Sequence, residues 1–310
     1  MAGPYGAPMG VGEARLVAVT GSTGLVGRSL CARLEGGGFR VRRLVRRAAS
    51  RTGETSWDPS AAGLDSAAFD GVDAVVHLAG ENLSAGRWTR RRKEDILRSR
   101  VEGTGLLART LAALPRPPRV LLSASAVGWY GDRGDETLDE TSGPGTGFLA
   151  DVCARWEAAT EPARESGIRV VLLRSGVVLS GDGGALPRMA RPFRMFAGGR
   201  VGSGRQWVSW ISREDAVGAI LHLLSAESVS GPVNLVAPAP ATNGELSCAI
   251  GRTLHRPCWL PVPRFVLRLA FGEMAGVVLA STRVLPGRLT ASTFSYRCPD
   301  LASTLAAELR

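Results

Sequence analysis

Three glycines at a fixed spacing, directly after a short apolar run, constrain the fold of this chain more than any other feature. The segment Gly21–Gly27 reads GSTGLVG, with glycines at positions 21, 24 and 27. It follows the apolar run Arg15–Thr20 and opens a periodic segment that predicts a helix over Leu25–Glu35. A strand, a glycine-rich turn and a helix in this order are typical of the phosphate-binding loop of a Rossmann unit.

Each glycine of this loop has a separate task. Gly21 permits the tight turn, Gly24 lets the backbone approach a pyrophosphate, and Gly27 lets the helix pack closely on the sheet. The helix N-terminus offers unpaired N–H groups to the phosphates. We therefore predict that the loop binds a dinucleotide, the alternative being a tight turn without a ligand. The predicted contacts are Gly21, Ser22, Thr23, Gly24, Leu25, Val26 and Gly27.

The residues after the second predicted strand favour NADP(H) over NAD(H). An NAD enzyme places an acidic residue about 20 residues past the third glycine, where it binds the adenosine ribose. Here the strand Arg40–Val45 is followed by Arg46 and Arg47, with no acidic residue between Val41 and Arg51. A guanidinium binds a 2′-phosphate through two parallel hydrogen bonds, whereas a carboxylate repels it. Arg46 and Arg47 are therefore predicted cofactor contacts, unless they only reflect the frequency of arginine.

Strands and helices alternate as far as about residue 180. Further buried strands are predicted at Gly71–Ala79, Arg119–Ser123 and Arg169–Leu173, the last of which completes the series. Helices are predicted over Thr89–Leu114 and Leu149–Ser166. This order predicts the α/β class, with a Rossmann-type doubly wound parallel sheet and a smaller C-terminal substrate lobe.

The chain is expected to divide into four parts, because its pattern becomes irregular beyond about residue 180. These are a disordered tail over 1–14, a dinucleotide-binding Rossmann domain over 15–180, substrate-lobe elements over 181–250 and a small C-terminal subdomain over 251–310. The longest apolar runs are far shorter than the roughly 18 residues that a membrane span needs, so no membrane contact is expected. The N-terminal residues do not resemble a signal peptide, and a cytoplasmic location is expected.

The net positive charge of the chain suggests a nucleic-acid partner, but the predominance of arginine over lysine argues against one. The net charge is +10, and a single lysine, Lys93, stands among 38 basic residues. This preference for arginine reflects a general composition bias. The densest run, RRRK over 90–93, is expected to be a solvated face, since no nucleic-acid-binding motif accompanies it. Nucleic acid is therefore an unlikely partner.

The five cysteines are far apart and include no CxxC pair. They predict free thiols, a reducing compartment and no metal site.

Further motifs, together with the GxxGxxG spacing, carry a family resemblance. They are HLAGENL (77–83), RW (87–88), the pair Ser99–Arg100, SASAVGWYGD (123–132), ARWE (154–157), LRSGVVLSGDGG (173–184) and GSGRQWVSWI (202–211). The glycine spacing resembles the extended short-chain dehydrogenase/reductase superfamily. The full set is similar to an atypical branch, the NAD-dependent epimerase/dehydratase-like proteins, some labelled SulA-like, with a short C-terminal domain of unknown function. The resemblance runs from Arg15 onward.

The resemblance implies NADP(H) and a set of cofactor contacts. The loop after the third strand would line the adenosine side, and an arginine on the long helix would face the nicotinamide or the phosphates. One strand end would lie beneath the nicotinamide, and another segment would pass over its far edge. In that order the implied residues are Leu78, Ala79 and Gly80, then Arg100, then Ser123, then Arg174 and Val178.

The usual catalytic pair of short-chain dehydrogenases, Tyr-x-x-x-Lys, is missing. None of the three tyrosines is followed by a lysine four residues later. By analogy, Leu149 takes the tyrosine position and Cys153 the lysine position, where Cys153 is expected to be an inert core thiol. His77, at the end of a buried strand, is expected to be a packed histidine.

Two residues are predicted to replace the missing pair as catalytic groups. Ser125 could hydrogen-bond a substrate oxygen, and Tyr130 could supply a phenol. Arg100 could stabilise a developing oxyanion. The structural alternatives are that Ser125 satisfies loop backbone and that Tyr130 packs in its loop. The leading hypothesis is an NADP(H)-dependent oxidoreductase or epimerase-like enzyme acting on an unidentified small molecule, as a monomer or homodimer. The rival is a non-catalytic NADPH-binding redox sensor or regulatory protein.

Overall fold

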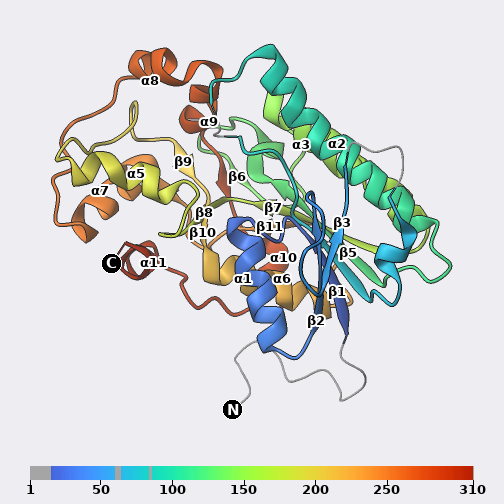
Figure 1. Ribbon diagram of the computed structural model, residues 1–310. Helices are drawn as coiled ribbons and strands as arrows, with labels where there is room; N and C mark the ends of the chain where they lie inside the picture. Colours follow the sequence, from blue (N-terminus) through green and yellow to red (C-terminus); the bar gives the residue numbers. More distant parts are fainter. Residues whose placement is uncertain (1–14, 60–63, 84–85, 310) are drawn as a thin grey trace.

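A parallel seven-stranded sheet organises the chain, with strand order β11-β7-β5-β4-β1-β2-β3 (Figure 1). It is seen in a computed structural model, which describes residues 15–59, 64–83 and 86–309. The strands are β1 (Leu16–Thr20), β2 (Arg40–Val45), β3 (Glu54–Ser56), β4 (Ala74–His77), β5 (Val120–Ala126), β7 (Arg169–Ser175) and β11 (Gly231–Leu235). The strand order reverses between β1 and β4, which is where ligands of open α/β sheets bind. The tail expected over 1–14 lies outside the described residues.

Helices cover both faces of the sheet. They are required because successive apolar side chains of β1 point to opposite faces, so both faces must be buried. Val17 and Val19 point to the face covered by α1 (Leu25–Gly36) and α6 (Arg213–Ser225). Leu16 and Ala18 point to the opposite face. That face is covered by α2 (Arg90–Ala112), α4 (Glu161–Glu165) and the neighbouring α3 (Phe148–Ala158). The predicted Rossmann-type α/β class is therefore confirmed.

Two of the expected elements are wrong in detail. The helix expected over Leu149–Ser166 is divided into α3 and α4, because Pro162 lacks an N–H group and cannot continue a helix. The sheet is not completed by Arg169–Leu173, since β11 pairs in parallel with β7. Gly231 and Pro232 are unfavourable in strands, so the sequence pattern does not predict β11. The proline is tolerated there because β11 is an edge strand.

A second layer of short elements forms the lobe beside the sheet. Its core joins α5 (Leu186–Arg194), α7 (Asn243–Thr253) and α11 (Leu301–Glu308) through buried residues that include Phe193, Trp210, Leu246 and Leu305. The short strands are β6 (Thr137–Leu138), β8 (Val177–Leu179), β9 (Trp207–Val208), β10 (Trp210–Ser212), β12 (Ala241–Thr242) and β13 (Arg283–Val284).

The C-terminal segment returns to the main sheet after leaving the lobe. It contains α8 (Arg264–Phe271), a 3-10 turn, α9 (Ala275–Leu279) and α10 (Gly287–Ala291). Leu289 and Phe294 lie in the same buried cluster as Val17 of β1. The last 60 residues therefore contribute to the main core as well as to the lobe. Among the described residues, no helix combines the length and apolar character needed to cross a bilayer.

Candidate functional site

The glycine loop lies at the reversal point of the sheet, pressed against the end of β4. Gly21 has φ +66°, and a Cβ there would lie 2.7 Å from the carbonyl carbon of Leu78. A Cβ on Gly27 would lie 2.1 Å from the carbonyl oxygen of Gly21. Gly24 caps α1 without a side-chain hydrogen bond, and the first turn of the helix carries no acidic residue. The positive end of the α1 dipole is thus left open to an anion.

The side chains of the loop fit a phosphate ligand. Ser22 is 5 % exposed, and its hydroxyl has no hydrogen-bond partner among the residues that the structure describes. Thr23 is exposed, while Leu25 and Val26 are half-buried. A buried hydroxyl without a partner is destabilising unless a ligand or water satisfies it. The loop therefore supplies backbone N–H groups and the Ser22 hydroxyl as donors for phosphate oxygens.

A buried hydrogen-bond chain fixes the end of β4 relative to the loop. Thr20 Oγ1 accepts from the backbone N–H groups of Leu78 and Ala79, at 3.1 and 3.2 Å. Its own hydroxyl hydrogen is then left for His77 Nδ1 at 2.7 Å, so His77 Nε2 donates to Thr104 at 2.9 Å. Burial lowers the pKa of His77 to about 4. His77 is therefore a neutral packed histidine, as predicted.

The two arginines after β2 have different surroundings. The Arg46 side chain is 74 % exposed, and its guanidinium lies 4.0 Å from the Glu81 carboxylate. Arg47 instead forms a bidentate pair with Glu54, at 2.5 and 2.9 Å. Arg46 thus faces solvent beside the loop after β4, whereas Arg47 holds the turn between β2 and β3.

Arg100 supports the loop after β4 from within α2. Its guanidinium donates to the carbonyl oxygens of Glu81, at 3.0 Å, and Ile96, at 3.2 Å. It lies 5.0 Å from the centre of the Trp156 ring, a cation–π distance. Burial lowers the pKa of Arg100 from its usual value. A Cβ on Gly80 would lie 3.5 Å from the Arg100 Cζ atom, so this arginine is directly behind the expected adenosine-side loop.

A buried ionic cluster occupies the carboxyl ends of β5 and β7. The Glu157 carboxylate accepts a hydrogen bond from the Ser125 hydroxyl at 2.6 Å. It also accepts from Arg174 Nε and Nη2, both at 2.8 Å, in a bidentate pair. Both partners of the pair are buried. Glu157 is absent from the expected site residues, and its place in the ARWE segment is the one sequence signal that could have found it.

Tyr130 belongs to the same cluster. Its hydroxyl accepts from Arg174 Nη1 at 3.1 Å and donates to Asn234 Oδ1 at 2.8 Å. The residue is fully buried, and this burial raises the pKa of the phenol above its usual value. Arg174 lies 4.0 Å over the Trp129 ring. The structure therefore brings Ser125, Tyr130 and Arg174 together, although it engages each of them with protein partners.

Two predicted site residues, Ser123 and Val178, and the expected core thiol Cys153 remain to be placed. Ser123, two positions before Ser125 on β5, is fully buried, and its hydroxyl has no partner within the described parts of the chain. Val178 is half-buried on β8. Burial raises the pKa of the Cys153 thiol to about 12, which makes it an inert core thiol. The described residues contain no group of three potential metal ligands.

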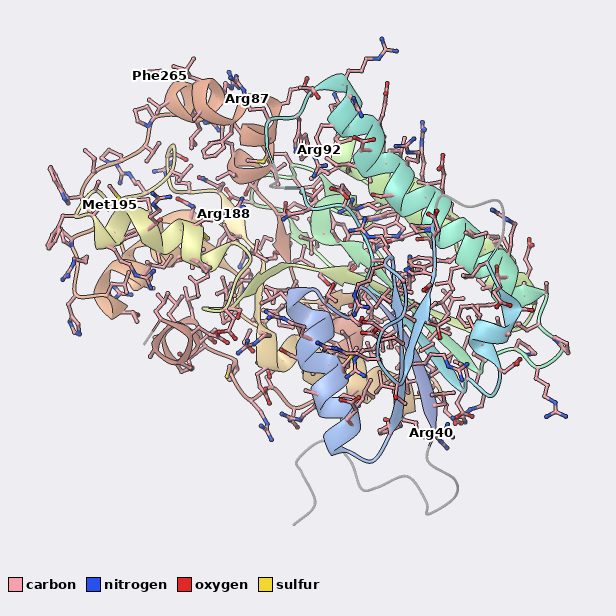
Figure 2. The ribbon with its side chains drawn as sticks, in the orientation of Figure 1. Arg40, Arg87, Arg92, Arg188, Met195 and Phe265 are labelled. Carbon is pink, nitrogen blue, oxygen red and sulfur yellow. The ribbon has the colours of Figure 1, made fainter. Side chains whose placement is uncertain are left out.

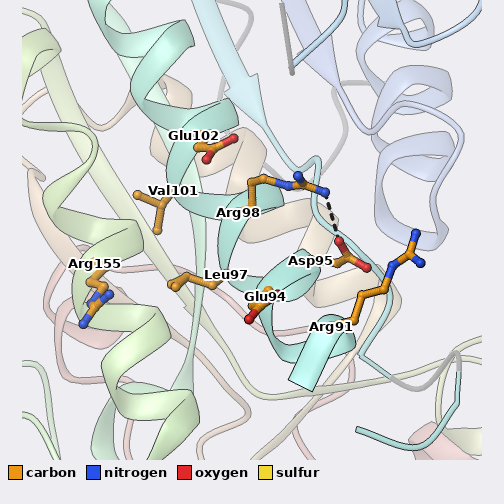
Figure 3. A pocket seen from close by; sticks show the side chains of 8 residues that line it. All are labelled: Arg91, Glu94, Asp95, Leu97, Arg98, Val101, Glu102 and Arg155. Atoms are coloured by element: carbon orange, nitrogen blue, oxygen red, sulfur yellow. Dashed lines mark hydrogen bonds and ion pairs between the residues drawn. The ribbon is translucent and has the colours of Figure 1, made fainter. Parts of the chain in front are cut away.

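A separate groove of roughly 620 Å³ runs between α2 and α3 (Figure 3). It is lined by Arg91, Glu94, Asp95, Leu97, Arg98, Val101, Glu102 and Arg155. At 100° per residue, the charged α2 residues of the groove lie on the side of the helix opposite Arg100, which points to the loop after β4. The groove is therefore distinct from the glycine loop.

The fold and the glycine loop together define a short-chain dehydrogenase/reductase of the extended, atypical kind. The sequence pattern of the NAD dependent epimerase/dehydratase family matches residues 17–236, and the chain belongs to this family. Residues 262–308 match a domain of unknown function, DUF1731. The predicted resemblance is therefore confirmed.

Individual relatives agree with this assignment. Epimerase family protein Mb2239 of Mycobacterium bovis is 44 % identical over 94 % of this chain and 96 % of its own length. The crystal structure of human epimerase family protein SDR39U1 with NADPH is 35 % identical, has a TM-score of 0.87 and is matched over 94 % of this chain and 98 % of that one. A UDP-glucuronic acid 4-epimerase from Bacillus cereus, 14 % identical with a TM-score of 0.74, is matched over 94 % of this chain and 97 % of that one and shares the fold.

Proposed function

We propose that this protein binds NADP(H) at the carboxyl edge of β1 and β4 and acts as an oxidoreductase or epimerase-like enzyme on a small molecule. The observation that carries the proposal is the glycine loop, where Gly21 and Gly27 leave no room for a side chain and the buried Ser22 hydroxyl has no partner within the described part of the chain. The NADPH in the human relative supports the choice of cofactor. When bound, NADP(H) supplies or accepts a hydride.

These observations support a set of proposed cofactor contacts. The backbone N–H groups at the start of α1 and the Ser22 hydroxyl would hold the phosphates. Arg46 would hold the 2′-phosphate, because it is the exposed arginine of the pair, while Arg47 would keep the turn in place through Glu54. Leu78, Ala79 and Gly80 would line the adenosine side, and Arg100 would support that loop from behind.

Ser125 is the proposed contact to a substrate oxygen. Its hydroxyl hydrogen is directed to Glu157, which leaves an oxygen lone pair to accept a hydrogen bond from a substrate hydroxyl. Arg174 holds the Glu157 carboxylate in position through two hydrogen bonds, and Tyr130 acts through Arg174 by holding its guanidinium in place. This arrangement would orient a substrate alcohol without the usual tyrosine and lysine.

Cofactor choice is tested by titrating the protein with NADPH and with NADH. We expect tighter binding of NADPH, and we expect Arg46→Ala to weaken NADPH binding by about 10-fold or more while NADH binding hardly changes, since a charge-assisted contact contributes about 1.5–3 kcal/mol. Arg40→Ala, at the opposite end of β2, is the matched control. Equal or tighter binding of NADH would overturn the proposal.

The chemistry is tested by following NADPH oxidation in the presence of carbonyl compounds and nucleotide sugars. We expect turnover by the parent protein and its loss in Ser125→Ala, with NADPH affinity unchanged. Tight NADPH binding with no turnover on any compound would contradict an enzymatic role.

A second candidate function is a non-catalytic NADPH-binding redox sensor or regulatory protein. It is favoured by one observation, that the hydroxyls of Ser125 and Tyr130 are both engaged in buried hydrogen bonds with protein partners. Capture of a protein partner only in the presence of NADPH would support this function. The free thiols of the described chain fit a reducing compartment such as the cytoplasm.

A further inference from the structure

Two cysteines that are ten residues apart in the sequence meet in the lobe. Cys248 lies on α7, and Cys258 lies in the segment that follows this helix. Their sulfur atoms are 3.2 Å apart, both side chains are half-buried, and both thiols are free. The sequence predicts isolated thiols here, because no CxxC motif marks the pair.

The backbone brings the two thiols together and holds them there. His255 has φ +53°, which turns the chain back along α7, and the Arg256 N–H group then donates to the Gly251 carbonyl at 2.8 Å. A Cβ on Gly251 would lie 2.8 Å from the Arg256 oxygen and 3.4 Å from the Cys258 Cβ. On the other side, the N–H groups of Trp259 and Leu260 both donate to the Gly198 carbonyl at 3.1 Å. Cys258 is therefore fixed between two hydrogen-bonded anchors.

We propose that Cys248 and Cys258 form a reversible dithiol–disulfide site that is oxidised by hydroperoxides. Bond formation needs the sulfurs to approach from 3.2 Å to about 2.05 Å, a movement of about 1 Å that side-chain rotation can supply. One thiolate attacks the peroxide, becomes a sulfenic acid and releases one equivalent of water or alcohol. The second thiol attacks the sulfenic sulfur, the disulfide forms and water leaves. The two cysteines lose two electrons and two protons, and the peroxide gains them.

The surroundings keep one of the two thiols protonated. Burial, together with the neighbouring Cys248, raises the pKa of the Cys258 thiol to about 11, although Arg200 and Arg252 oppose this rise. Cys258 therefore stays protonated near neutral pH, and this slows its attack on a peroxide.

The cross-link would restrain an apolar edge of the lobe. Trp259 follows Cys258 directly, is 66 % exposed, and donates through Nε1 to the Phe196 carbonyl at 3.1 Å. Met195 and Phe196 are also exposed at this edge, where Figure 2 shows Met195 at the end of α5. A disulfide would fasten α7 to the segment that carries Trp259. This inference does not depend on cofactor binding or on a substrate.

The test is oxidation of the full-length protein with one to five equivalents of hydrogen peroxide, followed by thiol counting in denaturant and peptide mapping. We expect the number of free thiols to fall from five to three. Trypsin cleaves after Arg252 but not between Arg256 and Pro257, so the disulfide would join peptides 214–252 and 253–264. Treatment with dithiothreitol should restore all five thiols.

Cys248→Ser and Cys258→Ser should each abolish the linked peptides, whereas Cys298→Ser, another half-buried thiol, should retain them. In Cys258→Ser, a sulfenic acid trapped by dimedone should accumulate on Cys248. Loss of thiols without the linked peptides, or over-oxidation of Cys258 in the parent protein, would overturn the proposal. So would a full count of five thiols after peroxide treatment.

Discussion

Gly27 and Gly36 lie in the same helix, but only one of them has no room for a methyl group. A Cβ on Gly27 would lie 2.1 Å from the Gly21 carbonyl oxygen, whereas a Cβ on Gly36 would meet nothing within 4 Å. We expect Gly27→Ala to lower NADPH affinity at least 100-fold, because the loop must open to admit the methyl group. Gly36→Ala should bind like the parent. Calorimetric titration of both variants gives the measurement, and parent-like binding by Gly27→Ala would be inconsistent with this loop as the phosphate site.

His77 predicts a pH dependence of stability. Its pKa is about 4 when folded, against 6.5 as the ordinary value, so the unfolded chain binds the proton first. Stability is therefore complete above pH 6.5 and falls as the pH drops from 6.5 to 4, by at most about 3 kcal/mol. Urea unfolding at pH 7, 6 and 5 measures this slope. His77→Gln should have a shallower slope, and His255→Gln, an exposed site, should keep the parent slope.

The sequence could predict the cofactor loop because its geometry is local. Gly21 and Gly27 contact residues that are close in the chain or at the next strand end, so their spacing already carries the constraint. Glu157 could not be predicted in this way, because its partners Ser125 and Arg174 come from two different strands. The contact between Cys248 and Cys258 could not be predicted either, because it depends on the turn at His255, where φ is positive.

At the scale of elements, the Glu157–Arg174 pair joins α3 to β7. Both side chains are less than 10 % exposed, so removing one leaves an unpaired buried charge. We expect Glu157→Gln and Arg174→Met each to destabilise the protein by about 3–5 kcal/mol. The double variant Glu157→Gln/Arg174→Met should lose less stability than the sum of the two single losses. Chemical unfolding of the set measures the coupling, and additive effects would mean that the pair is not a unit.

Element boundaries could be read from periodicity where the pattern is strong. The strand expected at Arg40–Val45 has the expected bounds, and the long helix begins and ends within two residues of its expected limits. The short polar strand Glu54–Ser56 and the Gly-Pro strand β11 carry no such pattern, since tertiary pairing rather than local preference makes them strands. The lobe could be expected only as an irregular region for the same reason.

At the scale of the whole molecule, early and late parts of the chain are interleaved. The Arg297 N–H group donates to Asp215 at the start of α6, at 2.7 Å, and Asn234 of β11 donates to the Leu285 carbonyl at 3.0 Å. The carboxylate of Glu140 accepts from the N–H groups of Asn234 and Arg288. Hydrogen bonds thus join the C-terminal segment to the sheet and to α6. These bonds argue against a C-terminal part that folds independently.

This interleaving predicts a single cooperative unfolding transition that NADPH moves as a whole. A ligand at 100 times its dissociation constant stabilises the folded state by about 2.7 kcal/mol, which for a chain of this size raises the midpoint by about 5 °C. Differential scanning calorimetry should therefore show one peak, with matching calorimetric and van't Hoff enthalpies, displaced upward by NADPH. NADH at the same concentration should displace it less. Two peaks, of which NADPH moves only one, would mean that the lobe unfolds apart from the sheet, in spite of the contacts of Leu289 and Phe294 with the main core.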